Sequence, residues 1–199
     1  RARQARRLAE ILVATDDARI AAAAESFGVA VAMTSPDHPS GTDRIAEAIR
    51  GRAADVVVNV QGDEPLIDPA LIDRVAGTLL DAADWDMATA AAPIRSAEEL
   101  HNSDVVKVVR ARDGRALYFS RSVIPHVRGA PAGHPPVPGE HFRHIGIYGY
   151  RRAFLERLVQ EPPCALENLE KLEQLRALSI GCRMAVLDGE AFGIGVDSP

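Results

Sequence analysis

Two acidic positions have surroundings that suit metal and phosphate chemistry. Gly62 and Asp63 follow a strongly apolar stretch at 55–60, and a glycine there lets the backbone approach a ligand while the carboxylate points out of the sheet edge. Asp197 follows a second apolar run. Carboxylate oxygens suit Mg²⁺, which also keeps waters and a substrate phosphate. Taken alone, Asp63 is also compatible with a turn, and Asp197 with a helix cap.

The segment Ser40-Gly41-Thr42-Asp43-Arg44 stands at the start of an expected helix. Free backbone N–H groups, the positive end of the helix dipole and Arg44 could bind a phosphate or a base edge there. The alternative is that Ser40 or Thr42 is an ordinary N-cap and that Arg44 is solvated. The chain has neither a GxGxxG nor a GxxxxGK[ST] loop, which argues against a dinucleotide dehydrogenase and a Walker-type ATPase.

The second half of the chain holds side chains suited to an acidic, hydroxyl-rich ligand. Arg121 follows an expected strand and could clamp a carboxylate with two hydrogen bonds. On the next strand, strict alternation puts His144, Gly146, Tyr148 and Tyr150 on one face. His144 and Tyr148 could hydrogen-bond hydroxyl groups. Each of these residues taken singly is also compatible with a structural role.

An apolar stripe predicts a helix over 166–179. Five leucines, spaced three apart, form the stripe, and the charged and polar residues around it are expected to be a solvated face. The stripe consists of Leu166, Leu169, Leu172, Leu175 and Leu178, and the surrounding residues are Glu167, Glu170, Lys171, Glu173 and Gln174.

Short apolar runs alternate with helical patterns and predict an α/β fold. The first half shows the strand–helix–strand rhythm of a parallel sheet, and the looser second half predicts an antiparallel portion. Ligands of such sheets bind beyond the carboxyl ends of the strands. A proline- and glycine-rich stretch, 126–141, is expected to be a surface loop. The expected strands are 11–15, 29–33, 55–60, 87–92, 105–110, 116–120, 145–150 and 183–188, and the other helices are 17–26, 43–50, 69–80 and 151–160.

Composition narrows the class of protein. The 199 residues, 47% hydrophobic and 26% charged, are enough for one folded domain. A net charge of −5 and only 5% aromatic residues argue against a nucleic-acid binder. Cys164 and Cys182 lack metal-ligand spacing and are expected to be reduced. No long apolar run or GxSxG motif is present, so we expect a cytoplasmic protein without membrane insertion and without a serine nucleophile.

Taken in order, the motifs resemble those of one enzyme family across nearly the whole chain. The motifs are Ile-Leu-Val-Ala-Thr-Asp-Asp at 11–17, Ser-Gly-Thr-Asp-Arg at 40–44, Val-Asn-Val-Gln-Gly-Asp-Glu-Pro at 58–65, Val-Lys-Val-Val at 106–109, Ala-Leu-Tyr-Phe-Ser-Arg at 116–121, His-Ile-Gly-Ile-Tyr-Gly-Tyr at 144–150, Leu-Glu-Gln-Leu-Arg at 172–176 and Gly-Val-Asp-Ser-Pro at 195–199. This combination is similar to that of the 3-deoxy-manno-octulosonate (Kdo) cytidylyltransferases, also called CMP-Kdo synthetases.

The resemblance implies a Rossmann-like nucleotidyltransferase with a mixed, mainly parallel sheet and a small antiparallel portion. It implies a homodimer that uses Mg²⁺ to join CTP and Kdo, giving CMP-Kdo and pyrophosphate for lipopolysaccharide synthesis. By the resemblance, Asp63 and Asp197 would hold the metal, and Gln61 would lie between nucleotide and sugar. These three residues and Arg121 are the implied catalytic residues. The implied CTP pocket contains Thr15, Asp16, Ser40, Gly41, Thr42, Arg44, Gln61 and Gly62, and the implied Kdo pocket contains Gln61, Arg121, His144, Tyr148, Glu173 and Gln174.

The chain departs from the family pattern at its start. Family members carry an N-terminal strand and a basic loop that grips the CTP triphosphate, which nothing here matches, and they continue into a further helix. We therefore expect residues 1–199 to be one nucleotidyltransferase domain of a longer enzyme, and to turn over poorly alone. Full activity at an intact mass of 21.4 kDa would contradict this.

Two other interpretations stay open. A CMP-sugar synthetase for N-acylneuraminate or 8-amino-Kdo would share the fold and the metal chemistry but would have a different sugar pocket. A non-catalytic nucleotide-binding domain would fit the missing phosphate loop.

Overall fold

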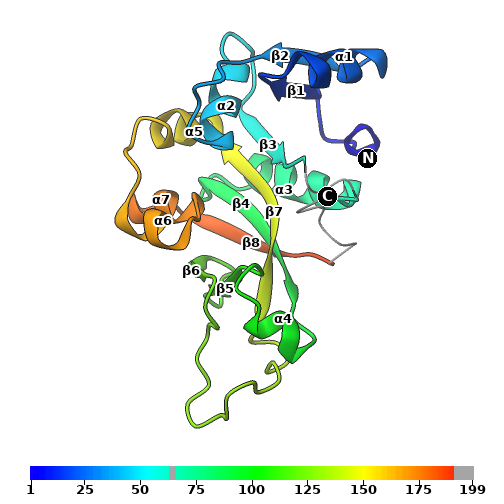
Figure 1. Ribbon diagram of the computed structural model, residues 1–199. Helices are drawn as coiled ribbons and strands as arrows, with labels where there is room; N and C mark the ends of the chain where they lie inside the picture. Colours follow the sequence, from blue (N-terminus) through cyan, green and yellow to red (C-terminus); the bar gives the residue numbers. More distant parts are fainter. Residues whose placement is uncertain (63–65, 191–199) are drawn as a thin grey trace.

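The N-terminal part of the chain forms a strand–helix–strand unit. The computed structural model describes residues 1–62 and 66–190. Strands β1 (Leu12–Thr15) and β2 (Ala30–Met33) pair in parallel, joined by α1 (Ala18–Ser26) (Figure 1). The side chain of Asp17 caps α1 by accepting from the Arg19 amide at 2.7 Å. A short 3-10 helix, η1 (Ala2–Gln4), precedes this unit.

The main sheet is built around one long strand, β7 (Phe142–Arg151). It runs antiparallel to three neighbours, whereas β4 and β8 pair in parallel. The expectation of a mixed α/β sheet is therefore confirmed, but the antiparallel portion is larger than expected because β7 lies between β3 and β4. The other strands are β3 (Val56–Val60), β4 (Met87–Pro93), β5 (Lys107–Arg110), β6 (Ala116–Ser120) and β8 (Met184–Asp188).

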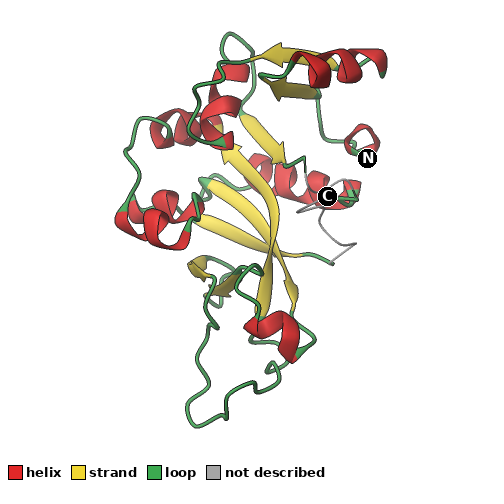
Figure 2. Cartoon of the chain, in the orientation of Figure 1, coloured by secondary structure: helices red, strands yellow, loops and turns green. Residues whose placement is uncertain are grey.

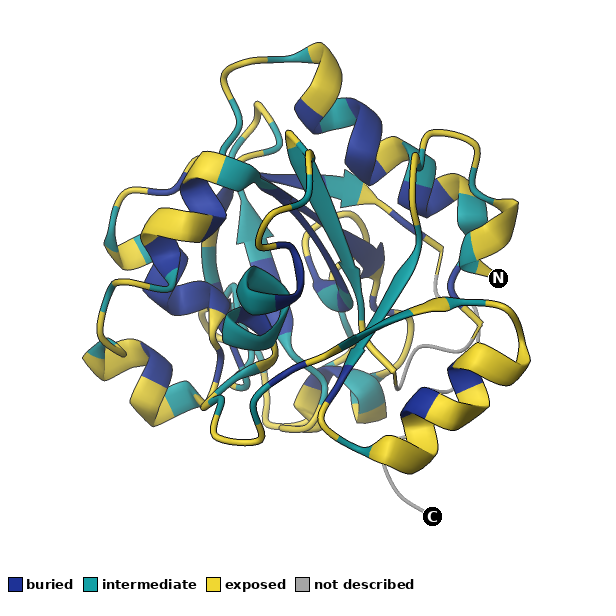
Figure 3. Ribbon diagram, turned by 90° about the horizontal axis from the view of Figure 1, so that it is seen from above, coloured by how far each residue is buried: buried dark blue, intermediate teal, exposed yellow. Residues whose placement is uncertain are grey.

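Helices cover both faces of this sheet, as Figure 2 shows. On one face, α3 (Pro69–Asp81) buries Leu71, Val75 and Leu79 against β3, β4 and β7. On the other, α2 (Gly41–Ala48), α5 (Arg152–Leu158) and two short helices enclose a second core. The buried sides of the helices turn toward the sheet in Figure 3. Helix α4 (Ala97–His101) follows β4 and lies at the lower end of the sheet in Figure 1. Residues 126–141 contain no helix or strand, as predicted.

None of the helices that the structure describes is long and apolar enough to cross a membrane.

The single helix predicted over 166–179 is wrong. The structure has α6 (Ala165–Glu170) and α7 (Gln174–Ser179), separated by Lys171 in the left-handed conformation with φ of 55°. This break turns the chain, so the apolar stripe does not continue across it. Leu172 and Leu175 are buried, whereas Leu169 is 80% exposed and Leu166 is 44% exposed.

A buried ion pair holds the two short helices together. The Arg176 guanidinium on α7 donates from Nε and Nη2 to both carboxylate oxygens of Glu167 on α6, at 2.9 and 2.6 Å. Both side chains are at most 10% exposed. Glu167 also accepts from the Cys164 amide and so closes a capping box. The pair therefore fixes the angle between the helices and the cap of the first one.

We predict that Glu167→Gln lowers the free energy of unfolding by about 3 kcal/mol, because it leaves the Arg176 charge buried without its partner. The matched control is Glu156→Gln, which breaks the exposed Arg152–Glu156 pair and should cost less than about 0.5 kcal/mol. Urea titration measures both. Equal effects would show that the buried pair does not stabilise the fold.

Candidate active site

The carboxyl end of β1 meets the start of α2 through a single guanidinium. Arg44 donates from Nη1 to Thr34 Oγ1 at 2.6 Å and from Nη2 to Asp16 Oδ2 at 3.1 Å. Thr15 is buried and its hydroxyl accepts from the Asp17 amide. Arg44 is therefore held in place and is not a solvated side chain. The structure thus brings together Thr15, Asp16 and Arg44, three members of the CTP pocket that the family resemblance implies.

The first turn of α2 combines a cap and a long-range contact. Ser40 caps the helix by accepting from the Asp43 amide at 3.3 Å, as the N-cap interpretation proposed. Gly41 leaves open space, because an added Cβ would meet no atom within 4 Å. Thr42 is buried, and its hydroxyl donates to Glu173 Oε2 at 2.6 Å. This bond joins the predicted nucleotide side to the predicted sugar side.

Gln61 and Gly62 follow directly after β3. The last residue of β3, Val60, pairs with Ile147 of β7, so both residues leave the sheet beside the strand that carries His144 and Tyr148. Both are exposed, and a Cβ at Gly62 would meet no atom of the described residues within 4 Å. The predicted metal ligands Asp63 and Asp197 lie outside the described residues.

Arg121 is positioned by neutral oxygen atoms. Its guanidinium donates from Nε to the Glu170 carbonyl oxygen at 2.8 Å and from Nη1 to the Ser103 carbonyl oxygen at 3.2 Å. The Glu170 carboxylate instead accepts from the Arg121 backbone amide at 2.9 Å and from the Ser120 hydroxyl at 2.6 Å. Among the residues that the structure describes, no carboxylate forms an ion pair with this guanidinium. Its charge is therefore available to an anionic ligand.

His144, Tyr148 and Tyr150 share one face of β7, as predicted. The ring centroids of His144 and Tyr148 are 5.2 Å apart, and those of Tyr148 and Tyr150 are 6.2 Å apart. Phe119 of β6 meets the His144 ring edge-on at 5.3 Å. Removal from solvent lowers the pKa of His144 to about 3 and raises the pKa of Tyr148 well above its ordinary value. These side chains are therefore neutral hydrogen-bonding groups at physiological pH.

The junction between α6 and α7 faces this cluster. Removal from solvent is the main cause of the raised pKa of Tyr148, and the nearby Tyr150 and the charge of Glu173 raise it further. Gln174, beside Glu173, is 5% exposed. The expected solvated acidic face is therefore wrong for Glu167, which is buried in its ion pair with Arg176. Glu170 and Glu173 also bond to other elements, although Glu173 is exposed. The predicted sugar-side residues lie on β7, directly after β6 and at the start of α7.

Lys107 is a buried cation that the sequence analysis did not select. Its side chain is completely buried, and Nζ donates to the carbonyl oxygens of Asn102, Val105 and Arg121 at 2.8, 2.8 and 2.5 Å. Loss of solvation and the nearby Arg121 charge lower its pKa. Three carbonyl acceptors satisfy the three protons of an ammonium group. Lys107 thus ties the turn after α4 to the backbone of Arg121.

Thr89 and Glu170 were also missed as candidates for the site. Thr89 bonds to His144, and Glu170 holds the backbone at Arg121. A lone threonine in an alanine-rich strand has no distinguishing pattern, and Glu170 belonged to the face expected to be solvated. Their roles come from tertiary contacts between distant segments.

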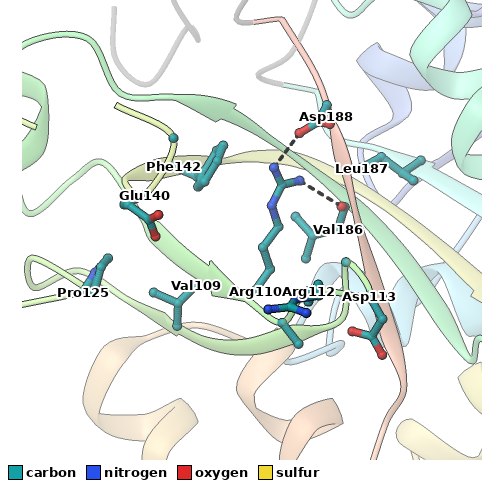
Figure 4. A pocket seen from close by; sticks show the side chains of 13 residues that line it. Val109, Arg110, Arg112, Asp113, Pro125, Glu140, Phe142, Val186, Leu187 and Asp188 are labelled. Carbon is teal, nitrogen blue, oxygen red and sulfur yellow. Dashed lines mark hydrogen bonds and ion pairs between the residues drawn. The ribbon is translucent and has the colours of Figure 1, made fainter. Parts of the chain in front are cut away.

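A cavity of about 710 Å³ lies apart from these residues. The hairpin between β5 and β6, the start of β7 and the end of β8 line it (Figure 4). Arg110 crosses it, pairing with Asp188 at 2.7 Å and lying 4.3 Å above the ring centre of Phe142. None of the candidate residues that the structure describes lines this cavity.

The fold and these clusters agree with a nucleotidyltransferase, and comparison with known proteins gives the family. The model of the cytidylyltransferase family matches residues 1–185. The chain therefore belongs to the cytidylyltransferase family.

Individual relatives carry a more specific name. The chain is 52% identical over 196 residues to the 3-deoxy-manno-octulosonate cytidylyltransferase of Pseudomonas fluorescens, covering 95% of this chain and 77% of the relative. It is 46% identical to the enzyme of the same name from Geobacter sulfurreducens, covering 100% and 82%. A solved CMP:2-keto-3-deoxy-manno-octonic acid synthetase in complex with CTP has a TM-score of 0.90 at 40% identity, covering 100% of this chain and 79% of that one.

We predict that Lys107→Met lowers the free energy of unfolding by at least about 2 kcal/mol, because three buried carbonyl oxygens lose a charged donor. The chain's other lysine, Lys171, is exposed, so Lys171→Met serves as the control and should change stability by less than about 0.5 kcal/mol. Thermal and urea unfolding measure both. A Lys107→Met protein as stable as the control would remove this role.

The pKa of His144 predicts a pH dependence of stability. In the unfolded chain the imidazole takes up a proton as the pH falls below 6.5, whereas in the folded protein it does so only near pH 3. Stability should therefore fall by about 1 kcal/mol per pH unit between pH 6.5 and 4.5, above the range in which most carboxylates titrate. Urea titrations should show a shallower slope for His144→Gln. Identical slopes would place the titration elsewhere.

Proposed function

We propose that this cytidylyltransferase joins CTP to Kdo, releasing CMP-Kdo and pyrophosphate for lipopolysaccharide synthesis. The observation that carries the proposal is the Arg121 guanidinium, which is held by carbonyl oxygens and has no ion-pair partner among the described residues. His144 and Tyr148 on β7 add neutral hydrogen-bonding groups. A cation together with neutral hydrogen-bonding groups fits an acidic sugar rich in hydroxyls. The relatives named for Kdo and the similar structure solved with CTP support the same substrates.

The residues divide into two groups by the part of the reaction that each serves. On the nucleotide side, Arg44 and the first turn of α2 offer a cation and backbone N–H groups to CTP. On the sugar side, Arg121 would bind the carboxylate, while His144, Tyr148, Glu173 and Gln174 would read the hydroxyls. Gln61 would lie between the two substrates.

Catalysis in this proposal is mainly positioning. The anomeric hydroxyl of Kdo attacks the α-phosphorus of CTP, the new oxygen–phosphorus bond forms as the bond to pyrophosphate breaks, and the hydroxyl loses its proton. Holding both substrates in line converts a bimolecular encounter into a step within one complex. The Thr42–Glu173 bond fixes the nucleotide-binding turn against the sugar pocket, at 2.6 Å between the two oxygens.

Mg²⁺ belongs to the proposal as the cofactor held by Asp63 and Asp197. Carboxylate oxygens are the donors that it prefers. A Cβ added at Gly62, the residue before Asp63 in the sequence, would meet no atom of the described residues within 4 Å. When bound, the ion would neutralise phosphate charge.

A homodimer in the cytoplasm completes the proposal, and it rests on the family resemblance. Light scattering of the purified protein measures the oligomeric state, and a monomeric mass at micromolar concentration would contradict it.

A second candidate is a CMP-sugar synthetase for another acidic sugar. Arg121 would bind the carboxylate of N-acetylneuraminate or 8-amino-Kdo equally well. The discriminating groups would then be those that meet the hydroxyls and the acyl or amino substituent, at His144, Tyr148 and Glu173.

Pyrophosphate release tests the substrates directly. The full-length protein is incubated with CTP and Mg²⁺, and with Kdo, 8-amino-Kdo, N-acetylneuraminate or no sugar, each with an EDTA control. We expect release only with Kdo and metal together. Release with one of the other sugars alone would keep the chemistry and change the substrate, and none with any sugar would favour a nucleotide-binding domain.

We predict that Asp63→Ala lowers turnover by about 100-fold or more, because a metal ligand is lost, while the fold survives. Asp84→Ala, at an exposed position in the turn before β4, is the control and should retain full turnover. Circular dichroism checks the fold of both proteins. Unchanged turnover in Asp63→Ala would remove this residue from the metal site.

A further inference from the structure

Thr89 and His144 form a hydrogen bond between β4 and β7. The distance from Thr89 Oγ1 to His144 Nε2 is 2.8 Å, and Thr89 is completely buried. The same hydroxyl lies 2.7 Å from the carbonyl oxygen of Ile147 and 3.5 Å from that of Ile145. One hydroxyl group thus faces one ring nitrogen and two carbonyl oxygens.

The number of protons decides the direction of these bonds. A threonine hydroxyl has one proton to donate, and a carbonyl oxygen can only accept. An oxygen–oxygen distance of 2.7 Å is that of an O–H···O hydrogen bond, so the Thr89 proton lies toward Ile147. The contact with His144 then requires the ring to donate from Nε2–H to Thr89 Oγ1.

An irregularity in the sheet puts the hydroxyl in this place. Thr89 pairs with Tyr148, but the next residue, Ala90, pairs with Ile145, so Gly146 and Ile147 have no partner on β4. Such a bulge disrupts the regular ladder and re-aims nearby side chains. The Thr89 hydroxyl donates to the carbonyl oxygen of Ile147, a residue of the bulge. This bond fixes the direction in which the lone pairs of Thr89 Oγ1 point.

We propose that Thr89 is a positioning residue that sets the tautomer of His144, keeping the proton on Nε2 and leaving Nδ1 as an acceptor for a sugar hydroxyl. A neutral imidazole has one donor and one acceptor nitrogen, so fixing one fixes the other. Within residues 1–62 and 66–190, no group donates to His144 Nδ1. The part of this inference that concerns the sugar rests on the proposed function, whereas the tautomer does not.

The tautomer can be measured without any substrate. Long-range ¹H–¹⁵N spectra of protein labelled at histidine, with His144→Gln to assign the signal, distinguish protonated Nε2 from protonated Nδ1. We expect the Nε2–H form in the wild type and in Thr89→Ser, and a mixture or the Nδ1–H form in Thr89→Val. A wild-type Nδ1–H signal, or a Thr89→Val spectrum like that of the wild type, would overturn the assignment.

Steady-state kinetics test the consequence for the sugar. We expect Thr89→Val to raise the KM for Kdo about tenfold, the cost of about one hydrogen bond, with the KM for CTP unchanged and with recovery in Thr89→Ser. Thr78→Val, which removes a hydroxyl that bonds only within α3, is the control. Equal rises in both KM values, or none, would overturn the role toward the sugar. Wild-type protein inactive with Kdo would overturn the proposed substrate, and the spectra would still decide the tautomer.

Discussion

The bidentate contact between Arg176 and Glu167 is the interaction on which the sugar side of the site depends. It binds α7 to α6 across a left-handed residue, Lys171, and so holds a sharp turn in the chain. The turn sends the carboxylate of Glu170 to β6 and that of Glu173 to α2. In one continuous helix these two residues would lie on neighbouring positions of the same face. The break thus lets two nearby carboxylates serve two different elements.

Cations on this side of the sheet are anchored by backbone oxygen atoms. Lys107 and Arg121 both donate to carbonyl groups, and Lys107 donates to the carbonyl of Arg121 itself. A carbonyl satisfies the donor without neutralising its charge, so both side chains keep their positive charge. Burial makes such an arrangement costly unless every donor has a partner. The positive charge is therefore a built property of this region, which suits the binding of an anion.

The sequence predicted most of the elements but misjudged their connections. The apolar runs at 11–15 and 55–60 predicted strands correctly, although both strands, β1 and β3, are only partly buried. The helix over 166–179 was wrong because spacing alone cannot reveal that Lys171 adopts a left-handed conformation. Within the site, His144 and Tyr148 were found because a strand alternates strictly. Lys107 was missed because lysine is ordinarily exposed, and its burial depends on carbonyl groups from other segments.

The contrast between charged and neutral groups explains how one site can select an acidic sugar. Arg121 offers a permanent charge, which attracts any carboxylate and discriminates little among acidic sugars. His144 and Tyr148 are kept neutral by their surroundings, so each presents a donor or an acceptor in a fixed direction. A sugar that leaves such a group without a hydrogen bond loses binding free energy, because the group is buried and water does not replace the missing partner. In the proposed site, affinity for the sugar would therefore come mainly from the cation. Selectivity would come from the neutral residues and from those, such as Thr89, that orient them.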